Sequence, residues 1–221
     1  MRGRELRTVK IEVWSDIGCP WCYIGKRRLE TALAGFEQPV AVQWRSFQLD
    51  PGYPKDKRQP VYKALAEKKG SSLDQVRAMT EHVAELAALD GLTYDFERSV
   101  MVNTFDAHRL THLAKAQGLG GEMHERLMRA QLIEGQTLND VDTLVRLAAE
   151  VGVPNSAARR VLTSAEYAPE VSNDIREAHA LGVTGVPFFV LDRRYGISGA
   201  QPVEAFHSAL KTASDAARAT G

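Results

Sequence analysis

The first pattern along the chain is an alternation of apolar and polar side chains. Val9, Ile11 and Val13 are separated by polar residues within the segment 9–15, and Trp14 departs from the alternation. A period of two positions is typical of a strand whose two faces differ in polarity. A run rich in β-branched and aromatic residues, Val40–Phe47, predicts a second strand.

A helix is predicted between these two strands. From Trp21 to Phe36 the apolar residues recur at roughly helical spacing, and Gly35 lies where the helix should end. A helix that joins two neighbouring strands forms a right-handed crossover and makes the strands parallel. Residues 9–47 therefore predict one βαβ unit.

The middle of the chain is predicted to be helical. Asp50–Pro60 is dense in proline, glycine and charge, so it ends the first unit and marks a boundary. The next helix, with Gly91 as its stop, should bury one apolar face made of Leu73, Val76, Met79, Val83, Leu86 and Leu89. Further helices are expected over residues 105–117, 122–132, 141–150, 157–162 and 166–181.

The end of the chain returns to strand character. Residues 187–191 and 195–198 flank a turn at 192–194 as an antiparallel hairpin would, and a last helix should run from Pro202 to about Ala213. A compact solution is one sheet built from both ends of the sequence. We expect an α/β fold whose core comprises residues 1–60 and 182–221, with an all-helical insertion of residues 61–181.

The composition is that of an ordinary globular protein. Of the 221 residues, 44% are apolar and 25% are charged, which allows a large buried core. Lysine and arginine total 28, as do aspartate and glutamate, so the overall charge favours neither a nucleic acid nor a membrane surface as a partner. The charged first residues, and the lack of an apolar run of about 20 residues, predict a cytoplasmic protein.

Two cysteines, Cys19 and Cys22, have the clearest chemical meaning in the sequence. A Cys-x-x-Cys pair between a strand and a helix puts the first sulfur at the helix N-terminus, where N–H groups and the helix dipole favour a thiolate. Cys19 is therefore the expected nucleophile, and Cys22, one turn later, is the thiol that resolves a mixed disulfide. Pro20 suits the first helical position, and Trp21 offers a substrate an apolar surface beside the sulfur.

A zinc site is an alternative interpretation of the cysteine pair. The order Cys-x2-Cys followed by His108-x3-His112 supplies the ligand types that zinc prefers. Roughly 85 residues separate the two halves, however, where a compact zinc finger has about 12 to 15. We therefore expect a redox pair and no metal. A pair without a chemical role is the third alternative.

Pro187 has two interpretations. A proline at the first or an edge position of a strand is tolerated and needs no further role. Alternatively, a cis bond between Val186 and Pro187 brings backbone close to the dithiol and leaves a strand edge free for an extended substrate. Because the chain also holds Cys-x-x-Cys, we expect the cis bond, with Pro187 in the active site and Val186 against the substrate.

Asn103 and His108 are further candidates for the substrate site. Residues 103–109 first indicate a capped helix start with Asn103 or Thr104 as N-cap. Roles for Asn103 or His108 in a substrate pocket are the alternative. Glu12, on the first strand, is a candidate proton acceptor near Cys22.

Several segments together resemble the DsbA family of thioredoxin-fold proteins, specifically its FrnE-like branch. The matching segments span nearly the whole chain and are Ile11–Asp16, Cys19–Gly25, Asn103–Thr104 with Ala107–Arg109, Gly182–Phe189 and Ile197–Pro202. The resemblance implies a thioredoxin core made from both ends of the chain and a large all-helical insertion. It also implies Cys19 as nucleophile, Cys22 as its partner and a cis Pro187 facing them.

The resemblance further implies kinship with kappa-class glutathione transferases and 2-hydroxychromene-2-carboxylate isomerases, in which the first cysteine position is typically serine. This chain keeps both cysteines, so we expect a thiol–disulfide oxidoreductase that acts on protein or small-molecule disulfides without a cofactor. The alternative is a glutathione-dependent isomerase or transferase acting on a small aromatic substrate, with glutathione held near Ser198–Gln201. Periplasmic members usually carry histidine where this chain has Trp21, which leaves the direction of electron flow open. Both a monomer and a homodimer are compatible with the sequence.

Overall fold

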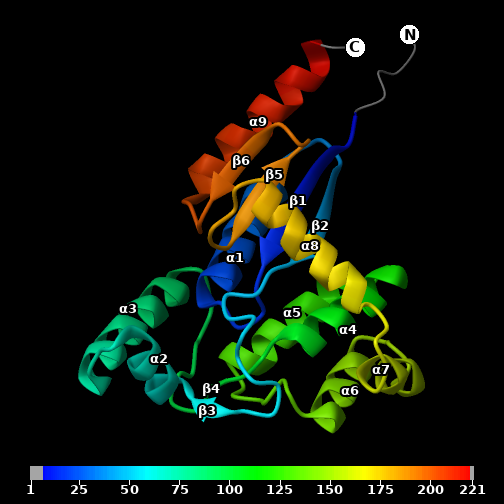
Figure 1. Cartoon of the computed structure of the whole chain (residues 1–221). Coiled ribbons are helices and arrows are strands. Elements are labelled where there is room, and N and C mark those ends of the chain that lie inside the picture. Colours follow the sequence, from blue (N-terminus) through cyan, green and yellow to red (C-terminus); the bar gives the residue numbers. More distant parts are fainter. Residues whose placement is uncertain (1–6, 220–221) are drawn as a thin grey trace.

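A four-stranded sheet forms the centre of the computed structural model, which describes residues 7–219. The central strand β1 (Val9–Ser15) pairs in parallel with β2 (Val40–Ser46) on one side and antiparallel with β5 (Phe188–Leu191) on the other. Strand β6 (Tyr195–Ser198) completes the order β2-β1-β5-β6 as the second half of a hairpin with β5. The predicted sheet, built from both ends of the sequence, is confirmed (Figure 1).

One face of the sheet is covered by α1 (Pro20–Ala34) and α9 (Val203–Ala219). Alternate side chains of β1, including Ile11 and Val13, pack here in one cluster with Phe206 and Leu210 of α9. Because side chains of a strand alternate between its faces, this side carries the odd-numbered residues of β1. Helix α9 continues beyond Ala213, where the sequence predicts its end, through an alanine-rich segment without glycine or proline.

The opposite face of the sheet packs against α8 (Ala168–Ala180). Trp14 is fully buried there, and its indole Nε1 donates to the backbone oxygen of Asp174 at 2.9 Å. Ala178 and Val190 belong to the same apolar cluster. The last helix of the predicted insertion therefore lies directly on the sheet, whose faces are both covered.

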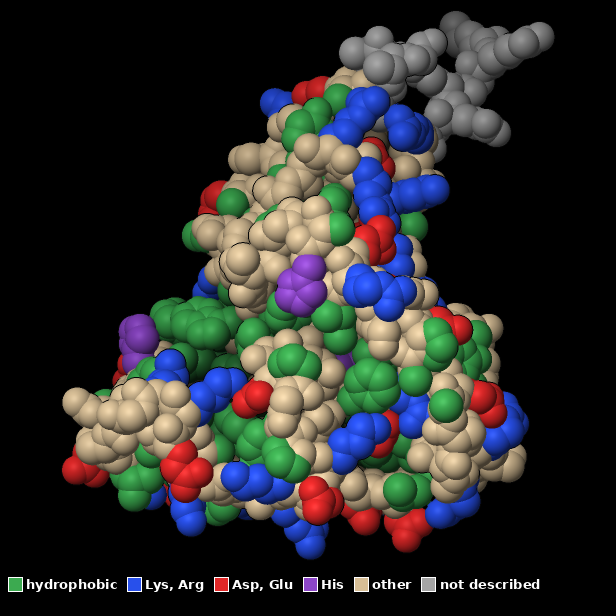
Figure 2. Space-filling view, in the orientation of Figure 1, with side chains coloured by type: hydrophobic (Ala, Val, Ile, Leu, Met, Phe, Trp, Pro, Cys, Tyr) green, Lys and Arg blue, Asp and Glu red, His purple; other side chains and the backbone are tan. Residues whose placement is uncertain are grey.

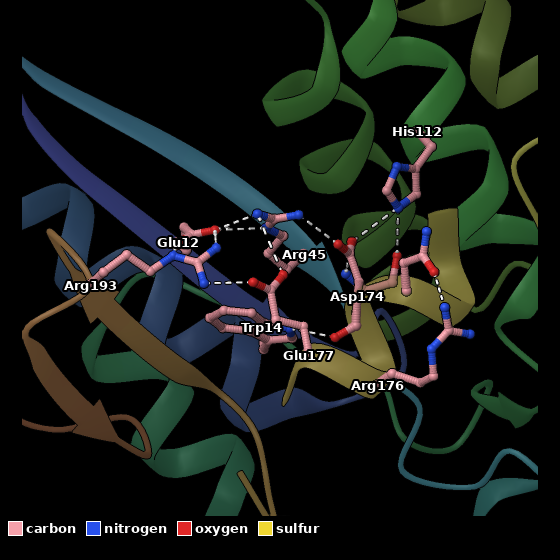
Figure 3. Close-up of polar contacts among 10 residues, drawn as sticks. Glu12, Trp14, Arg45, His112, Asp174, Arg176, Glu177 and Arg193 are labelled. Atoms are coloured by element: carbon pink, nitrogen blue, oxygen red, sulfur yellow. Dashed lines mark hydrogen bonds and ion pairs between the residues drawn. The ribbon is translucent and has the colours of Figure 1, made fainter. Parts of the chain in front are cut away.

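A network of charged side chains ties α8 to this face (Figure 3). Arg45 of β2 lies between Glu12 of β1 and Asp174 of α8, and its Nη1 is 2.8 Å from Asp174 Oδ1. Asp174 also accepts the Ser46 backbone N–H at 2.9 Å, and Arg193 of the β5–β6 turn pairs with Glu12. The prediction that Glu12 accepts a proton near Cys22 is wrong, because Glu12 lies on the face opposite α1 and its carboxylate is held by two arginines.

The remaining helices gather at the end of the sheet where β1 and β2 finish (Figure 1). They are α2 (Val61–Lys69), α3 (Leu73–Leu89), α4 (Phe105–Ala116), α5 (Gly120–Leu132), α6 (Val141–Glu150) and α7 (Asn155–Leu162). Two short strands that the sequence does not predict, β3 (Gln59–Pro60) and β4 (Val100–Met101), pair antiparallel beside them. Two residues are too few to show a strand alternation, so these strands form through tertiary contact.

The buried face of α3 matches the predicted one only in part, at Val76 and Val83. Among the residues predicted to be buried, Leu73, Met79 and Leu89 are 52%, 37% and 81% exposed. The buried positions are Val76, Thr80, Val83 and Ala87. These four recur every three or four residues, as one face of a helix requires, and the small Ala87 and Thr80 allow close packing. Within residues 7–219, none of the helices combines the length and apolar character needed to cross a membrane.

Candidate active site

The cysteine pair lies where β1 leads into α1. Cys19 is the N-cap residue of α1, and Pro20 and Cys22 follow in its first turn, as predicted. The Cys22 backbone N–H donates to the Cys19 carbonyl oxygen at 3.1 Å, which closes this turn. Cys19 is therefore at the positive end of a 15-residue helix, where free N–H groups stabilise negative charge on the sulfur.

Cys22 is enclosed by protein, with none of its surface exposed, whereas Cys19 is 3% exposed. Burial raises the pKa of the Cys22 thiol well above its ordinary value, and the neighbouring sulfur of Cys19 raises it further. The polar groups of Asp16 and Ser15 act on the pKa of Cys22 in the opposite direction. Cys22 is thus the more shielded member of the pair, as a resolving thiol should be.

The loop before β5 lies against the dithiol. The Val186–Pro187 peptide bond is cis, as predicted, and the Cys19 Sγ is 3.8 Å from the Val186 carbonyl oxygen. The Pro187 carbonyl oxygen accepts the Gly199 N–H at 2.8 Å, which anchors the loop to the segment that follows β6. Val186 and Pro187 are therefore neighbours of the Cys19 sulfur.

Gly25 allows α1 to approach this loop. A Cβ at position 25 would lie 2.9 Å from Pro187 Cγ and 3.1 Å from the ring of Phe189, which is fully buried. Contacts below about 3.0 Å are shorter than van der Waals packing permits, so a larger residue would push helix and loop apart. Gly25 was not among the predicted site residues, although it stands inside the segment that carries the family resemblance.

A buried acid, Asp16, supports the loop that leads to Cys19. Its Oδ2 accepts the Leu49 N–H at 2.8 Å, and its Oδ1 lies 3.5 Å from His108 Nε2. Burial by itself would raise the pKa of Asp16, but His108, the Leu49 N–H and the Thr104 hydroxyl outweigh it, and the pKa is lowered. The structure thus brings His108 to the base of the dithiol loop, 1% exposed, with its ring facing Asp16.

Asn103 is held within the protein. Its Oδ1 accepts the Phe105 N–H at 2.9 Å and faces Gln48 Nε2 at 3.2 Å, while its Nδ2 donates to the Tyr53 carbonyl oxygen at 2.6 Å. These bonds fix the start of α4 to the loop after β2. The N-cap residue itself is Thr104, the other candidate, and its side chain makes no capping hydrogen bond. Its role in substrate binding stays a prediction.

Apolar side chains lie next to the dithiol. Trp21 is 37% exposed, and Leu49, whose N–H binds Asp16, is 47% exposed. The Tyr94 hydroxyl donates to the Pro20 carbonyl oxygen at 2.6 Å, and burial raises the pKa of this phenol above its ordinary value. On the face shown in Figure 2, hydrophobic side chains gather where the narrower sheet part meets the wider helical part, over α3. An apolar surface is thus available beside the cysteine pair.

The histidines of the zinc alternative have other partners. His108 faces Asp16, whereas His112 Nε2 lies 3.1 Å from both Ser46 Oγ and Asp174 Oδ2. Among the residues that the structure describes, no group of three or more histidine, cysteine, aspartate or glutamate side chains is arranged to hold a metal ion. The cysteine and histidine side chains of the predicted zinc alternative therefore do not lie together as a set of metal ligands.

Comparison with known proteins agrees with this arrangement. The profile of the DSBA-like thioredoxin domain matches residues 10–211. The chain belongs to the DSBA-like thioredoxin domain family. The resemblance to the DsbA family and the predicted thioredoxin-like α/β fold with a helical insertion are both confirmed.

Individual relatives of this DsbA-like protein extend the comparison. A probable DsbA oxidoreductase from Streptomyces coelicolor is 47% identical, with a TM-score of 0.89 and coverage of 93% of this chain and 89% of that one. The uncharacterized protein YwbO of Bacillus subtilis is 29% identical over 216 residues, or 92% of this chain and 96% of its own length. A 2-hydroxychromene-2-carboxylate isomerase shares the fold, with a TM-score of 0.71, 16% identity and coverage of 96% and 99%. The chain is a DsbA-like oxidoreductase whose two cysteines lie close together.

Proposed function

We propose that this protein is a thiol–disulfide oxidoreductase in which Cys19 is the nucleophile and Cys22 the resolving thiol. The observation that carries the proposal is the position of the Cys19 sulfur, which is at the N-terminus of α1 and 3.8 Å from the carbonyl oxygen beside the cis Pro187. The thiolate is the reactive form of cysteine, and a helix N-terminus stabilises it. Cys22, one turn along the same helix, is within reach of the disulfide that Cys19 forms.

The chemistry proceeds in two exchanges. The Cys19 thiolate attacks one sulfur of a substrate disulfide, a new sulfur–sulfur bond forms, and the other substrate sulfur leaves as a thiolate that takes a proton from solvent. The Cys22 thiolate then attacks the Cys19 sulfur and expels the second substrate thiolate. The substrate is thereby reduced to two thiols, and the enzyme dithiol is oxidised to a disulfide. The reverse sequence oxidises a substrate dithiol.

The surroundings of Cys19 favour disulfides carried on polypeptides. Trp21 and Leu49 provide exposed apolar surface, and the Val186 backbone faces the reactive sulfur at the entry to β5. An extended peptide can pair with such a backbone segment, while its side chains contact apolar groups. Because only 3% of the Cys19 surface is exposed, the substrate must displace part of the neighbouring surface as it binds. We also propose that the helical insertion, residues 61–181, forms one wall of this binding region, and we place the protein in the cytoplasm.

Reduction of insulin by dithiothreitol, followed with wild type, Cys19→Ser and Cys22→Ser, tests the proposal. Wild type should accelerate the reaction, Cys19→Ser should be inactive, and Cys22→Ser should accumulate a mixed disulfide that mass spectrometry detects. Equal activity of wild type and Cys19→Ser would contradict the proposal. Full turnover of Cys22→Ser with glutathione would instead indicate the glutathione-dependent alternative.

A further inference from the structure

A tyrosine from the helical insertion is bound to the backbone between the two cysteines. Tyr94 follows α3, and its hydroxyl donates to the Pro20 carbonyl oxygen at 2.6 Å. Pro20 is the first residue of α1 and stands between Cys19 and Cys22. The two bonded residues are 74 positions apart in the sequence, so this bond joins the insertion directly to the Cys-x-x-Cys turn.

The same peptide group carries the N–H that is available to the Cys19 sulfur. The side chain of an N-cap residue can accept the N–H of the second or third helical residue, here Trp21 and Cys22. The Cys22 N–H already donates to the Cys19 carbonyl oxygen, and Pro20 has no N–H. In the part of the chain that the structure describes, the Trp21 N–H has no hydrogen-bond acceptor. It is therefore the donor left for a thiolate on Cys19.

Hydrogen bonds at the two ends of one peptide group strengthen each other. A donor at the carbonyl oxygen polarises the group and makes its N–H a better donor, by roughly 10 to 30% per bond. The Tyr94 hydroxyl binds the carbonyl of the Pro20–Trp21 peptide, and the Trp21 N–H is the other end of that peptide. The tyrosine therefore acts on a Cys19 thiolate through the backbone.

Side chains contribute little to the stability of a negative charge on Cys19. Its sulfur is 3.8 Å from the Val186 carbonyl oxygen, which can accept the proton of a thiol but repels a thiolate. Among residues 7–219, no lysine, arginine or histidine side chain hydrogen-bonds to this sulfur. The N–H groups in the first turn of α1 are the donors that remain, so the strength of the Trp21 N–H matters.

Tyr94 is held firmly in place as a donor. It is 9% exposed, and its ring stacks on Tyr23 with the centroids 6.3 Å apart and meets Phe96 edge-on at 5.6 Å. Burial raises the pKa of Tyr94 above its ordinary value, so the hydroxyl keeps its proton near neutral pH. The same segment has a second attachment to α1, because Asp90 Oδ2 lies 2.9 Å from Arg28 Nε. Loss of the hydroxyl alone should therefore leave the segment where it is.

We propose that Tyr94 is a positioning residue that stabilises the Cys19 thiolate through the Pro20–Trp21 peptide group and so raises the reduction potential of the dithiol. The inference rests on the proposed function and deepens it. The reduced pair carries the thiolate, whereas the disulfide carries no charge, so a group that favours the thiolate favours the reduced form. The helical insertion thereby sets how strongly the Cys19–Cys22 disulfide oxidises a substrate.

Tyr23→Phe is the matched control for Tyr94→Phe. Each change removes one hydroxyl and keeps both rings of the stacked pair. The Tyr23 hydroxyl donates to Oε1 of Glu125, a residue of α5, at 2.5 Å, and not to the Cys-x-x-Cys backbone. The control therefore makes the same chemical change beside the same ring and leaves the bond to the Pro20 carbonyl oxygen in place.

Two measurements test the proposal. The ultraviolet absorbance of the thiolate gives the acidity of Cys19 in a Cys22→Ser background, where a single thiol titrates. Tyr94→Phe should lower the acid dissociation constant of Cys19 about threefold, because the Trp21 N–H becomes a weaker donor, and Tyr23→Phe should not change it. Equilibration of the intact pair with glutathione at pH about 8 gives its potential. Tyr94→Phe should shift this equilibrium about threefold toward the disulfide, which lowers the potential by about 14 mV.

The outcomes distinguish the two proposals. If Tyr94→Phe has the Cys19 acidity and the potential of Tyr23→Phe, the role of Tyr94 is overturned, even if the variant is less stable to urea, because a purely structural contact changes stability alone. Wild type gives a second test that needs no folded variant: the amide proton resonance of Trp21 should move downfield as Cys19 ionises, and an unmoved resonance would overturn the inference. Insulin reduction by Cys19→Ser would overturn the proposed function itself, whereas the acidity of Cys19 would still report on Tyr94.

Discussion

Replacing Gly25 by alanine tests how closely α1 must approach the Pro187 loop. Alanine in a helix is favoured over glycine by about 1 kcal/mol, so the same substitution would stabilise the protein at a helix position where the added methyl group meets no other atom. Here the new Cβ would lie 2.9 Å from Pro187 Cγ and 3.1 Å from Phe189 Cζ. Overpacking of this kind costs about 1 to 3 kcal/mol, and a proline ring and a fully buried phenyl ring leave little freedom to relax.

The steric cost should therefore exceed the helix gain. We expect Gly25→Ala to lower the free energy of unfolding by about 1 kcal/mol, or the melting temperature by about 2 to 4 °C. A shift of the Pro187 loop by some tenths of an ångström should also reduce insulin reduction several-fold, because reactivity depends steeply on the placement of the reacting groups. Urea denaturation and the insulin assay measure the two effects.

Gly35→Ala is the matched control. Gly35 ends the same helix at a φ of −102°, and a Cβ there would meet nothing within 4 Å. This variant should be as stable as wild type or more stable by about 0.4 to 1 kcal/mol, with full activity. A Gly25→Ala protein that is as stable and as active as Gly35→Ala would refute the reasoning.

Three further predictions concern stability, all measured by urea denaturation. Asp174→Asn should lower the free energy of unfolding by about 3 kcal/mol, because the buried carboxylate accepts from Arg45 and the Ser46 N–H; a loss no larger than that of the exposed Asp56→Asn would contradict this. Burial lowers the pKa of His124, so below pH about 6.5 the unfolded chain binds a proton that the folded chain does not, and stability should fall as the pH drops toward 5. The argument fails if His124→Gln keeps the whole of this pH dependence. Arg109→Lys should cost about 2 kcal/mol, because the buried guanidinium donates to the carbonyl oxygens of Ser164 at 2.6 Å and Glu166 at 2.8 Å; the exposed Arg146→Lys is its control, and equal losses would argue against it.

Strong local patterns made much of the fold predictable. Val9–Ser15 and Val40–Ser46 are strands, and the hairpin around residues 192–194 has the predicted antiparallel pairing. The buried face of α3 was harder to predict, because apolar residues at helical spacing occupy more than one face of that helix. Its outward leucines, such as Leu89, remain exposed, while Ala87 packs inward. Hydrophobicity alone does not show which of these faces is buried, because burial depends on where the neighbouring helices pack.

The candidate site was predictable only in part, for a similar reason. Cys19, Cys22 and Pro187 stand in short motifs whose local geometry implies their chemistry. Asp16 and Leu49, whose contact supports the dithiol loop, are 33 positions apart, and no local pattern indicates their contact. Strand alternation puts Glu12 and Val13 on opposite faces of the sheet, but the sequence does not show which face α1 covers; the structure places α1 on the Val13 side.

The pairing of β1 with β5 also constrains how the protein can be made. Ile11 is paired with Leu191, so the middle strand of the sheet keeps one open edge until nearly the whole chain has left the ribosome. An unpaired strand edge invites association with other chains, and contacts of such long sequence separation form slowly. The complete four-stranded sheet that carries Cys19 can therefore form only when synthesis is almost finished. A chain that ends before residue 188 would lack β5 and β6 and could not form this sheet.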